Sequence, residues 1–144
     1  MVRQAIPGLR RARHDAVAAR RVREVCVDAT STAELIDGLL EPFNAALGVS
    51  GMIVGSTDPA TAIMSTATLV ENLPIAMAEP WMHNEIFDED FNKFSELRRT
   101  GAGPVTLDRA TQGNPHLSPR YRLNLAMGLG QEMRVTFMTA EACW

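Results

Sequence analysis

The sequence is poor in the residues that mark several large classes of protein. Only two cysteines occur in 144 residues, Cys26 and Cys143; they form no metal-binding spacing and do not suggest a disulfide framework. The longest stretch without a charge, Pro42 to Thr57, is 16 residues long and too polar to span a bilayer. No apolar segment follows the basic N-terminus, as a secretory signal requires. We therefore expect a cytoplasmic protein without a membrane segment.

Catalytic signatures are also missing. The chain has no G-x-S-x-G, no P-loop and no G-x-G-x-x-G motif. His14, His83 and His116 are scattered, without the i, i+4 pair of many zinc sites. The H-x-E at 83–85 lacks the P-C-x-x-C that completes a deaminase zinc site. We expect no enzymatic activity, no metal and no cofactor.

One stretch, "EPWMHNEIFDEDFNKFSEL" at 79–97, is dense in chemical groups. It holds six carboxylates and a histidine. Asp88, Asp90 and Asn92 match the first three ligand positions of an EF-hand loop, but lysine and arginine stand where its glycine and final glutamate belong. Calcium binding of that kind is therefore excluded.

The same stretch fits two short helices that divide near Phe87–Asp88. Asp88 is expected to cap the second helix, with Glu89 and Asp90 in its first turn, where the helix dipole favours negative charge. Four apolar residues spaced by four, three and three form a predicted core stripe: Phe87, Phe91, Phe94 and Leu97. We interpret the stretch as structural.

Two longer helices are predicted near the N-terminus. The first begins near Asp15 and has an apolar stripe that includes Cys26, where a thiol is expected to be inert packing. Ser31 and Glu34 have the spacing of a capping box for the second helix, and Gly48 is its expected stop.

The remaining pattern changes to short strands and helices. Runs at 51–56 and 62–70 around an Asp-Pro turn predict a β-hairpin, and 106–111 is expected to be semi-extended. Ser118 and Pro119 predict the start of a short helix. A half-buried strand with Met133, Val135 and Phe137 on one side is expected next, followed by a returning strand at 139–144.

This order of elements predicts an α+β fold with an antiparallel sheet and helices gathered on one face. The chain ends at Trp144 in what looks like an unfinished strand, so we expect a fragment that is incomplete at its C-terminal strand.

The net charge of −3 hides an asymmetry. Residues 1–23 carry seven arginines and one aspartate, a net of +6, so residues 24–144 carry −9. A basic arm on an acidic body fits either contact with nucleic acid or a solvated helix or leader. We divide the chain into an arginine-rich arm or helix start at 1–23 and one domain at 24–144.

Five segments occur in order along the chain and together resemble a known family. They are "TDPAT" at 57–61, the stretch at 79–97, "TLDRATQGNPHLSPRYR" at 106–122, "GLGQEMRV" at 128–135 and the final "ACW". This set resembles the N-terminal, GAF-like sensory region of actinobacterial LuxR-type helix-turn-helix transcriptional regulators. The resemblance covers about residues 24–144.

The resemblance implies a GAF/PAS-like antiparallel sheet flanked by helices, in a cytoplasmic protein that senses a small molecule or forms a homodimer. DNA binding would need a helix-turn-helix domain outside this chain. We expect a non-catalytic regulatory domain that binds a small apolar or amphipathic ligand. The candidate ligand-binding residues lie on the inner sheet face and the covering helix: Met52, Met64, Trp81, Met82, Tyr121 and Phe137. The alternatives are a dimerisation or protein-interaction module without a ligand, and nucleic-acid contact through the arm.

Overall fold

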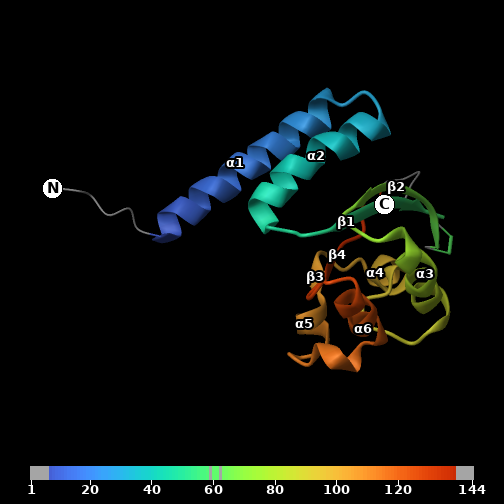
Figure 1. Ribbon diagram of the computed structural model, residues 1–144. Coiled ribbons are helices and arrows are strands. Elements are labelled where there is room, and N and C mark those ends of the chain that lie inside the picture. The colour runs from blue at the N-terminus through green and yellow to red at the C-terminus, as the bar shows by residue number, and fades with distance from the viewer. Residues whose placement is uncertain (1–6, 59, 62, 139–144) are drawn as a thin grey trace. The chain divides into compact units, whose positions relative to one another are not determined.

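The computed structural model describes residues 7–58, 60–61 and 63–138, with the side chains of all of these except 7–14 and 66–70. The chain divides into two compact units, with the boundary between Ser50 and Gly51. Helices are combined with two small antiparallel sheets, as the α+β class requires (Figure 1). In the described part of the chain, none of the helices has both the length and the apolar character needed to cross a membrane.

The first unit is a pair of helices lying side by side, α1 (Pro7–Asp28) and α2 (Thr32–Leu47) (Figure 1). The predicted caps of α2 are confirmed. The Ser31 hydroxyl oxygen accepts a hydrogen bond from the Glu34 N–H at 3.2 Å, and Gly48 ends the helix in the left-handed region with φ 62°. Arg23, the last residue of the predicted arm, lies inside α1, which is continuous from Pro7 to Asp28.

The two helices approach closely at Gly38. A Cβ atom at this position would lie 2.7 Å from Cγ1 of Val25, so the absence of a side chain sets the spacing of the helices. Cys26, one position beyond Val25, is exposed, and the prediction that its thiol is buried packing is wrong. The stripe of α1 is narrower than predicted, because only Ala18 among its described residues is fully buried.

The second unit begins with the predicted β-hairpin. Strands β1 (Met52–Thr57) and β2 (Met64–Glu71) pair antiparallel. In the turn between them, the Asp58 carboxylate accepts hydrogen bonds from the N–H groups of Ala60 at 3.0 Å and Thr61 at 2.8 Å. This local bonding by an aspartate side chain is the turn chemistry that the sequence indicated.

Short elements make up the rest of the second unit. In chain order they are η1 (Ile75–Met77), α3 (Ala78–Phe87), α4 (Phe94–Thr100), β3 (Val105–Thr106), α5 (Leu107–Ala110), η2 (Pro115–Leu117), α6 (Pro119–Ala126) and β4 (Met133–Arg134). Strands β3 and β4 pair antiparallel. The predicted start of α6 is confirmed, since the Ser118 hydroxyl oxygen accepts from the Tyr121 N–H at 3.3 Å.

The segment at 106–111 is mostly helical rather than semi-extended, because only Thr106 belongs to a strand and Leu107–Ala110 form α5. The Thr106 hydroxyl oxygen accepts a hydrogen bond from the Arg109 N–H at 3.2 Å and so caps the single turn of α5. A threonine followed by an aspartate in the next helical turn is a helix-start signal that the extended interpretation overlooked.

The acidic turn between α3 and α4 also differs from the prediction. Asp88 is the C-terminal cap of α3, and α4 begins only at Phe94, so Asp88 does not cap the second helix and Glu89 and Asp90 are not in its first turn. The cap comes instead from α3, because the Phe94 N–H donates to Glu85 Oε1 at 2.8 Å. The core stripe shrinks in consequence: Leu97 is buried, Phe91 and Phe94 are half-buried, and Phe87 is 72% exposed.

Strand β4 turns the opposite face inward from the one predicted. Arg134 is buried, whereas Met133 is 44% and Phe137 is 56% exposed. The reason is that Arg134 pairs with two carboxylates, those of Glu85 and Glu132. The alternation of polar and apolar residues along a strand does not reveal such partners. The predicted returning strand at 139–144 lies outside the described residues.

The cap of α2 gives a first prediction. Replacing Ser31 by alanine removes the acceptor for the Glu34 N–H, and we expect the free energy of unfolding to fall by about 1 kcal/mol. Urea denaturation followed by far-ultraviolet circular dichroism measures this loss. Ser50→Ala, at an exposed serine outside the helices, is the control; an equal loss in both variants would contradict the capping role.

Candidate buried charge network and aromatic site

The core of the second unit is unusually polar. Its buried apolar side chains include Leu97 and Leu107, but the largest fully buried side chain is that of Arg120. Other buried polar residues surround it: Asn84, Glu85, Asn92, Ser118, Asn124 and Arg134. Charged groups rarely lie in a core unless they are paired, so the partners of these side chains decide what the unit can do.

Arg120 is at the start of α6 and is the centre of the network. Its Nε donates to Glu132 Oε2 at 3.1 Å and its Nη2 donates to Oε1 at 2.7 Å, which is the two-pronged geometry that guanidinium and carboxylate favour. Nη2 also donates to the Phe91 carbonyl at 2.6 Å, and Nη1 donates to Asn84 Oδ1 at 3.3 Å. The backbone N–H of Arg120 donates to Asp90 Oδ2 at 2.8 Å. One side chain therefore ties α6 to α3, to the acidic turn and to the segment before β4.

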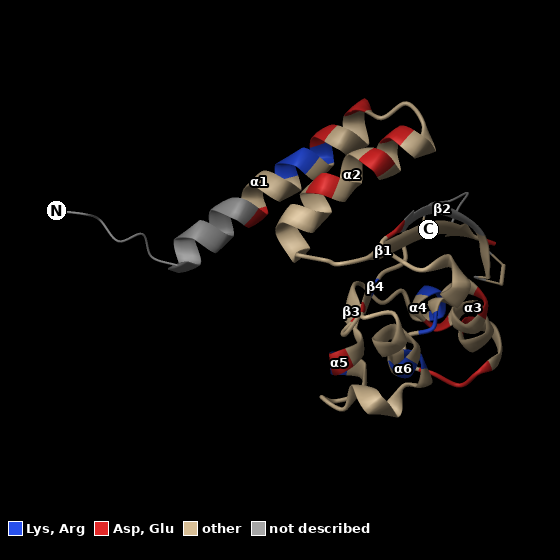
Figure 2. Cartoon of the chain, viewed as in Figure 1, with Lys and Arg blue, Asp and Glu red and all other residues tan. Residues whose placement is uncertain are grey.

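Arg134 is the second guanidinium of the network. Its Nη1 donates to Glu85 Oε2 at 2.6 Å and to the Asn92 carbonyl at 3.2 Å. Its Nε lies 3.1 Å from Glu132 Oε1, so Glu132 is shared between the two arginines. Figure 2 shows the acidic turn after α3 and the basic residues on α6 from which part of this network is built.

The aromatic rings of Trp81 and Phe94 lie against Arg134. Its guanidinium carbon is 4.7 Å from the Trp81 ring centroid and 4.5 Å from the Phe94 centroid, within the range of cation–π attraction. The two ring centroids are 6.4 Å apart, and both residues are half-buried. Nη2 of Arg134 is buried and has no hydrogen-bond partner among the groups in the structure.

The surroundings shift the pKa of the buried groups. Burial alone raises the pKa of the Asp90 carboxyl, but hydrogen bonds from the Ser118 hydroxyl and the Arg120 N–H outweigh it, and the pKa lies below its ordinary value. Burial likewise raises the pKa of Glu132, and the charges of Arg134 and Arg120 reverse the shift, so this pKa is also lowered. Burial lowers the pKa of the Arg134 guanidinium, and the negative charge of Glu132 only partly offsets this shift.

Each of these three carboxylates, Glu85, Asp90 and Glu132, accepts hydrogen bonds on both of its oxygens. Glu85 caps α4 with one oxygen and holds Arg134 with the other. Asp90 accepts from backbone N–H groups on both oxygens, and both oxygens of Glu132 are held by Arg120. Within the described residues, no group of three or more His, Cys, Asp or Glu side chains is arranged to hold a metal ion. The network can hold two guanidinium groups in fixed positions.

His83 lies at the margin of this network. Its Nε2 is 3.7 Å from Asp88 Oδ1, and its ring centroid is 5.1 Å from that of Phe87. Asp88 Oδ2 also accepts from the Asn84 side chain at 3.4 Å. Both members of the His83–Asp88 pair are substantially exposed, so the pair contributes little to stability.

The six predicted ligand residues occupy several places in the second unit. Met52 and Met64 are half-buried at opposite ends of the hairpin, Met52 opposite Glu71 and Met64 opposite Thr57. Trp81 lies on α3 against Arg134, with Met82 half-buried beside it in sequence.

The last two of the six lie on α6 and after β4. Tyr121 packs edge-on against His116, with ring centroids 5.0 Å apart, and Phe137 is 56% exposed. Of the six, Trp81 is the residue that the structure places in direct contact with the buried network.

The residues that sequence reasoning missed are Glu85, Asp90, Arg120, Glu132 and Arg134. The sequence predicts Asp90 in the first turn of a helix and offers Glu85 only as part of the H-x-E at 83–85, and it predicts neither arginine in the core. One signal was present in the sequence: Arg134 is the single charged residue in the run "MRVTFM" at 133–138. An arginine in such a run has either a solvent-facing side chain or a buried carboxylate partner, and only the tertiary structure distinguishes these.

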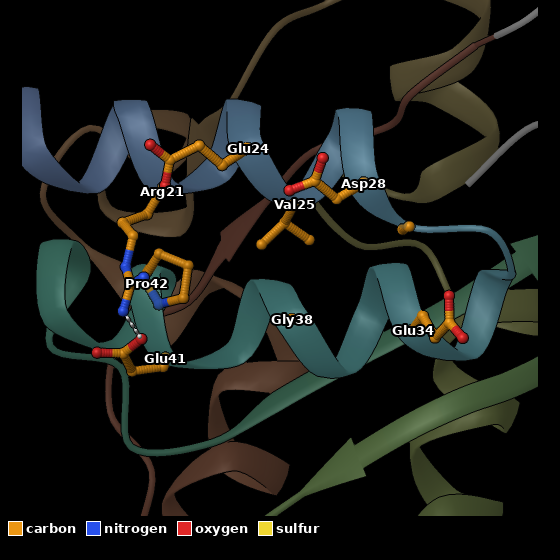
Figure 3. Close-up of a pocket in the computed structure, with 9 residues that line it drawn as sticks. Arg21, Glu24, Val25, Asp28, Glu34, Gly38, Glu41 and Pro42 are labelled. Atoms are coloured by element: carbon orange, nitrogen blue, oxygen red, sulfur yellow. Dashed lines mark ion pairs between the residues drawn. The ribbon is translucent and has the colours of Figure 1, made fainter.

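A second candidate site is an open cleft between α1 and α2 in the first unit, with a volume of about 410 Å³ (Figure 3). Four carboxylates line it together with Arg21, Val25, Ala29, Gly38 and Pro42: Glu24, Asp28, Glu34 and Glu41. Several of its charges are already paired, Arg21 with Glu41 at 3.5 Å and Glu34 with the Thr30 N–H at 2.8 Å. We interpret the cleft as a surface groove between two helices, a weaker candidate than the aromatic site.

Comparison of the chain with known protein families, with curated proteins and with solved structures finds no match. The resemblance to LuxR-type regulators therefore depends on the five sequence segments alone and stays a prediction.

The network predicts a large effect of a single substitution. Arg120→Met leaves Asp90 without its buried counter-charge and Glu132 with Arg134 alone, and we expect the free energy of unfolding to fall by about 3–5 kcal/mol. Arg122→Met, at an exposed arginine two positions along α6, is the matched control and should change it by less than about 0.5 kcal/mol. Urea denaturation of both variants measures the difference; similar losses in the two would refute the buried pairing.

The lowered pKa values of Asp90 and Glu132 predict a pH dependence. The unfolded chain takes up these protons at higher pH than the folded chain does. We therefore expect the stabilisation to be complete above about pH 5 and to be lost as the pH falls below about 4. Urea denaturation of the native chain and of Asp90→Asn between pH 7 and pH 3 tests this. The variant should show a shallower decline, and an unchanged slope would count against the role of Asp90.

Proposed function

We propose that this chain is a non-catalytic sensory domain that binds a small apolar or amphipathic molecule. The observation that carries the proposal is the environment of Arg134. Two half-buried aromatic rings, those of Trp81 and Phe94, lie against a buried guanidinium whose Nη2 has no partner. Apolar surface with one directed polar group is the usual composition of a small-molecule site.

The state of the carboxylates supports a binding function rather than a catalytic one. A general acid or base needs a proton that can be exchanged with a substrate, and its pKa normally lies near the working pH. Asp90 and Glu132 have lowered pKa values, so they remain ionised, and their oxygens already accept hydrogen bonds from other groups of the chain.

The resemblance to LuxR-type regulators supplies the context that we propose for this binding. The chain would be the GAF-like sensory region of a cytoplasmic regulator, and DNA would be bound by a helix-turn-helix domain outside it. The α+β class of the chain is compatible with this proposal. Ligand binding would then be the input that the regulator responds to.

A ligand screen by thermal shift tests the proposal. Acyl compounds, aromatic metabolites and nucleotides are added to the native chain, and at least one class should raise Tm. A ligand at a hundred times its Kd adds about 2.7 kcal/mol, which corresponds to a rise of several degrees. The shift should disappear in Trp81→Leu and persist in Phe87→Leu, at an exposed aromatic residue of the same helix. A flat Tm across the whole library would count against sensing.

A further inference from the structure

Resting on the proposed function, we infer that the ligand is electrically neutral and carries a hydrogen-bond acceptor that contacts Arg134 Nη2. The three features that lead to this inference are an unpartnered donor, a charge imbalance and an aromatic surface. All three meet around the Arg134 guanidinium.

The donor is defined by what the rest of the guanidinium does. Arg134 Nη1 is occupied by Glu85 and the Asn92 carbonyl, and Nε faces Glu132. Nη2 has two N–H groups and no acceptor in the structure, although the side chain is only 4% exposed. A buried donor without a partner is unfavourable, so an acceptor that binds Nη2 gains more than it would from a donor already hydrogen-bonded to water.

The charges around Arg134 exclude an anion as the preferred ligand. Glu85, Asp90 and Glu132 face Arg120 and Arg134, three negative charges against two positive. A carboxylate or phosphate ligand would add a fourth negative charge to this cluster, which already has one more negative than positive charge. The ligand would also lose its hydration on entry. A cationic ligand would lie directly beside the Arg134 guanidinium and be repelled by its positive charge. A carbonyl, ether or hydroxyl oxygen satisfies Nη2 without either penalty.

The aromatic rings define the body of the ligand. Trp81 and Phe94 are tilted by 53° to each other, with ring centroids 6.4 Å apart, and both are half-buried. Together they offer an apolar surface next to the Arg134 guanidinium. A flat apolar group that bears a single oxygen therefore fits better than a flexible polar molecule.

Three probes of nearly equal shape separate these contributions. Acetophenone is neutral and has a carbonyl acceptor, benzoate is an anion, and ethylbenzene has no acceptor. Each is titrated into the native chain while the Trp81 indole N–H and Arg134 Nε–H cross-peaks are followed in nitrogen–proton correlation spectra. We expect acetophenone to bind at least about tenfold more tightly than either of the other two, and to shift both cross-peaks.

Matched variants show where the probe binds. Trp81→Leu should weaken acetophenone binding by about tenfold or more, whereas Phe87→Leu should leave it unchanged. Circular dichroism of each variant identifies any loss of folding. If Trp81→Leu does not fold, the ranking of the three probes on the native chain still decides the inference.

The possible failures are distinguishable. Equal binding of all three probes, or tighter binding of benzoate, overturns the inference and leaves the sensory proposal standing. A crystal structure with acetophenone that shows a water on Nη2 and the probe elsewhere also overturns it. Absence of binding by any probe overturns it as well, and combined with a flat thermal-shift screen it overturns the proposed function too.

Discussion

The pairing of the buried Arg120 guanidinium with the Glu132 carboxylate is the interaction on which the second unit depends. Arg120 is fully buried, and its hydrogen bonds reach α3, the acidic turn and the segment before β4. A charge at this depth is tolerated only while every partner is present. The short helices of the unit have few buried apolar side chains of their own, so this polar core fixes their arrangement.

The two buried arginines, Arg120 and Arg134, also decide what the chemically dense stretch at 79–97 does. Its carboxylates are positioned by arginines that lie some 30 to 50 residues later in the chain, as the separations of 30 for Asp90–Arg120 and 49 for Glu85–Arg134 show. Because Glu85 also caps α4, it couples the end of one helix to the start of the next. The binding site that we propose follows from this arrangement, since the carboxylates hold Arg134 against the aromatic rings.

Charge has a different part in the first unit. There Arg20 pairs with Glu24, and Arg21 pairs with Glu41, on exposed surfaces where water and salt screen the attraction. The hairpin of α1 and α2 depends more on its caps and on the close approach at Gly38. Arginine–glutamate pairs thus contribute little to stability on the surface of the first unit and much more in the core of the second.

Features that depend on neighbouring residues could be predicted from the amino-acid sequence. The caps at Ser31, Gly48 and Ser118, the β-hairpin and the mixed α+β class follow from local hydrogen bonding and periodicity, which act over a few residues. The orientation of β4 and the role of the acidic turn could not be predicted in this way, because they are set by contacts between distant parts of the chain. Both depend on Arg120 and Arg134, whose partners are distant in sequence, and the spacing of side chains along a strand or helix contains no information about such partners.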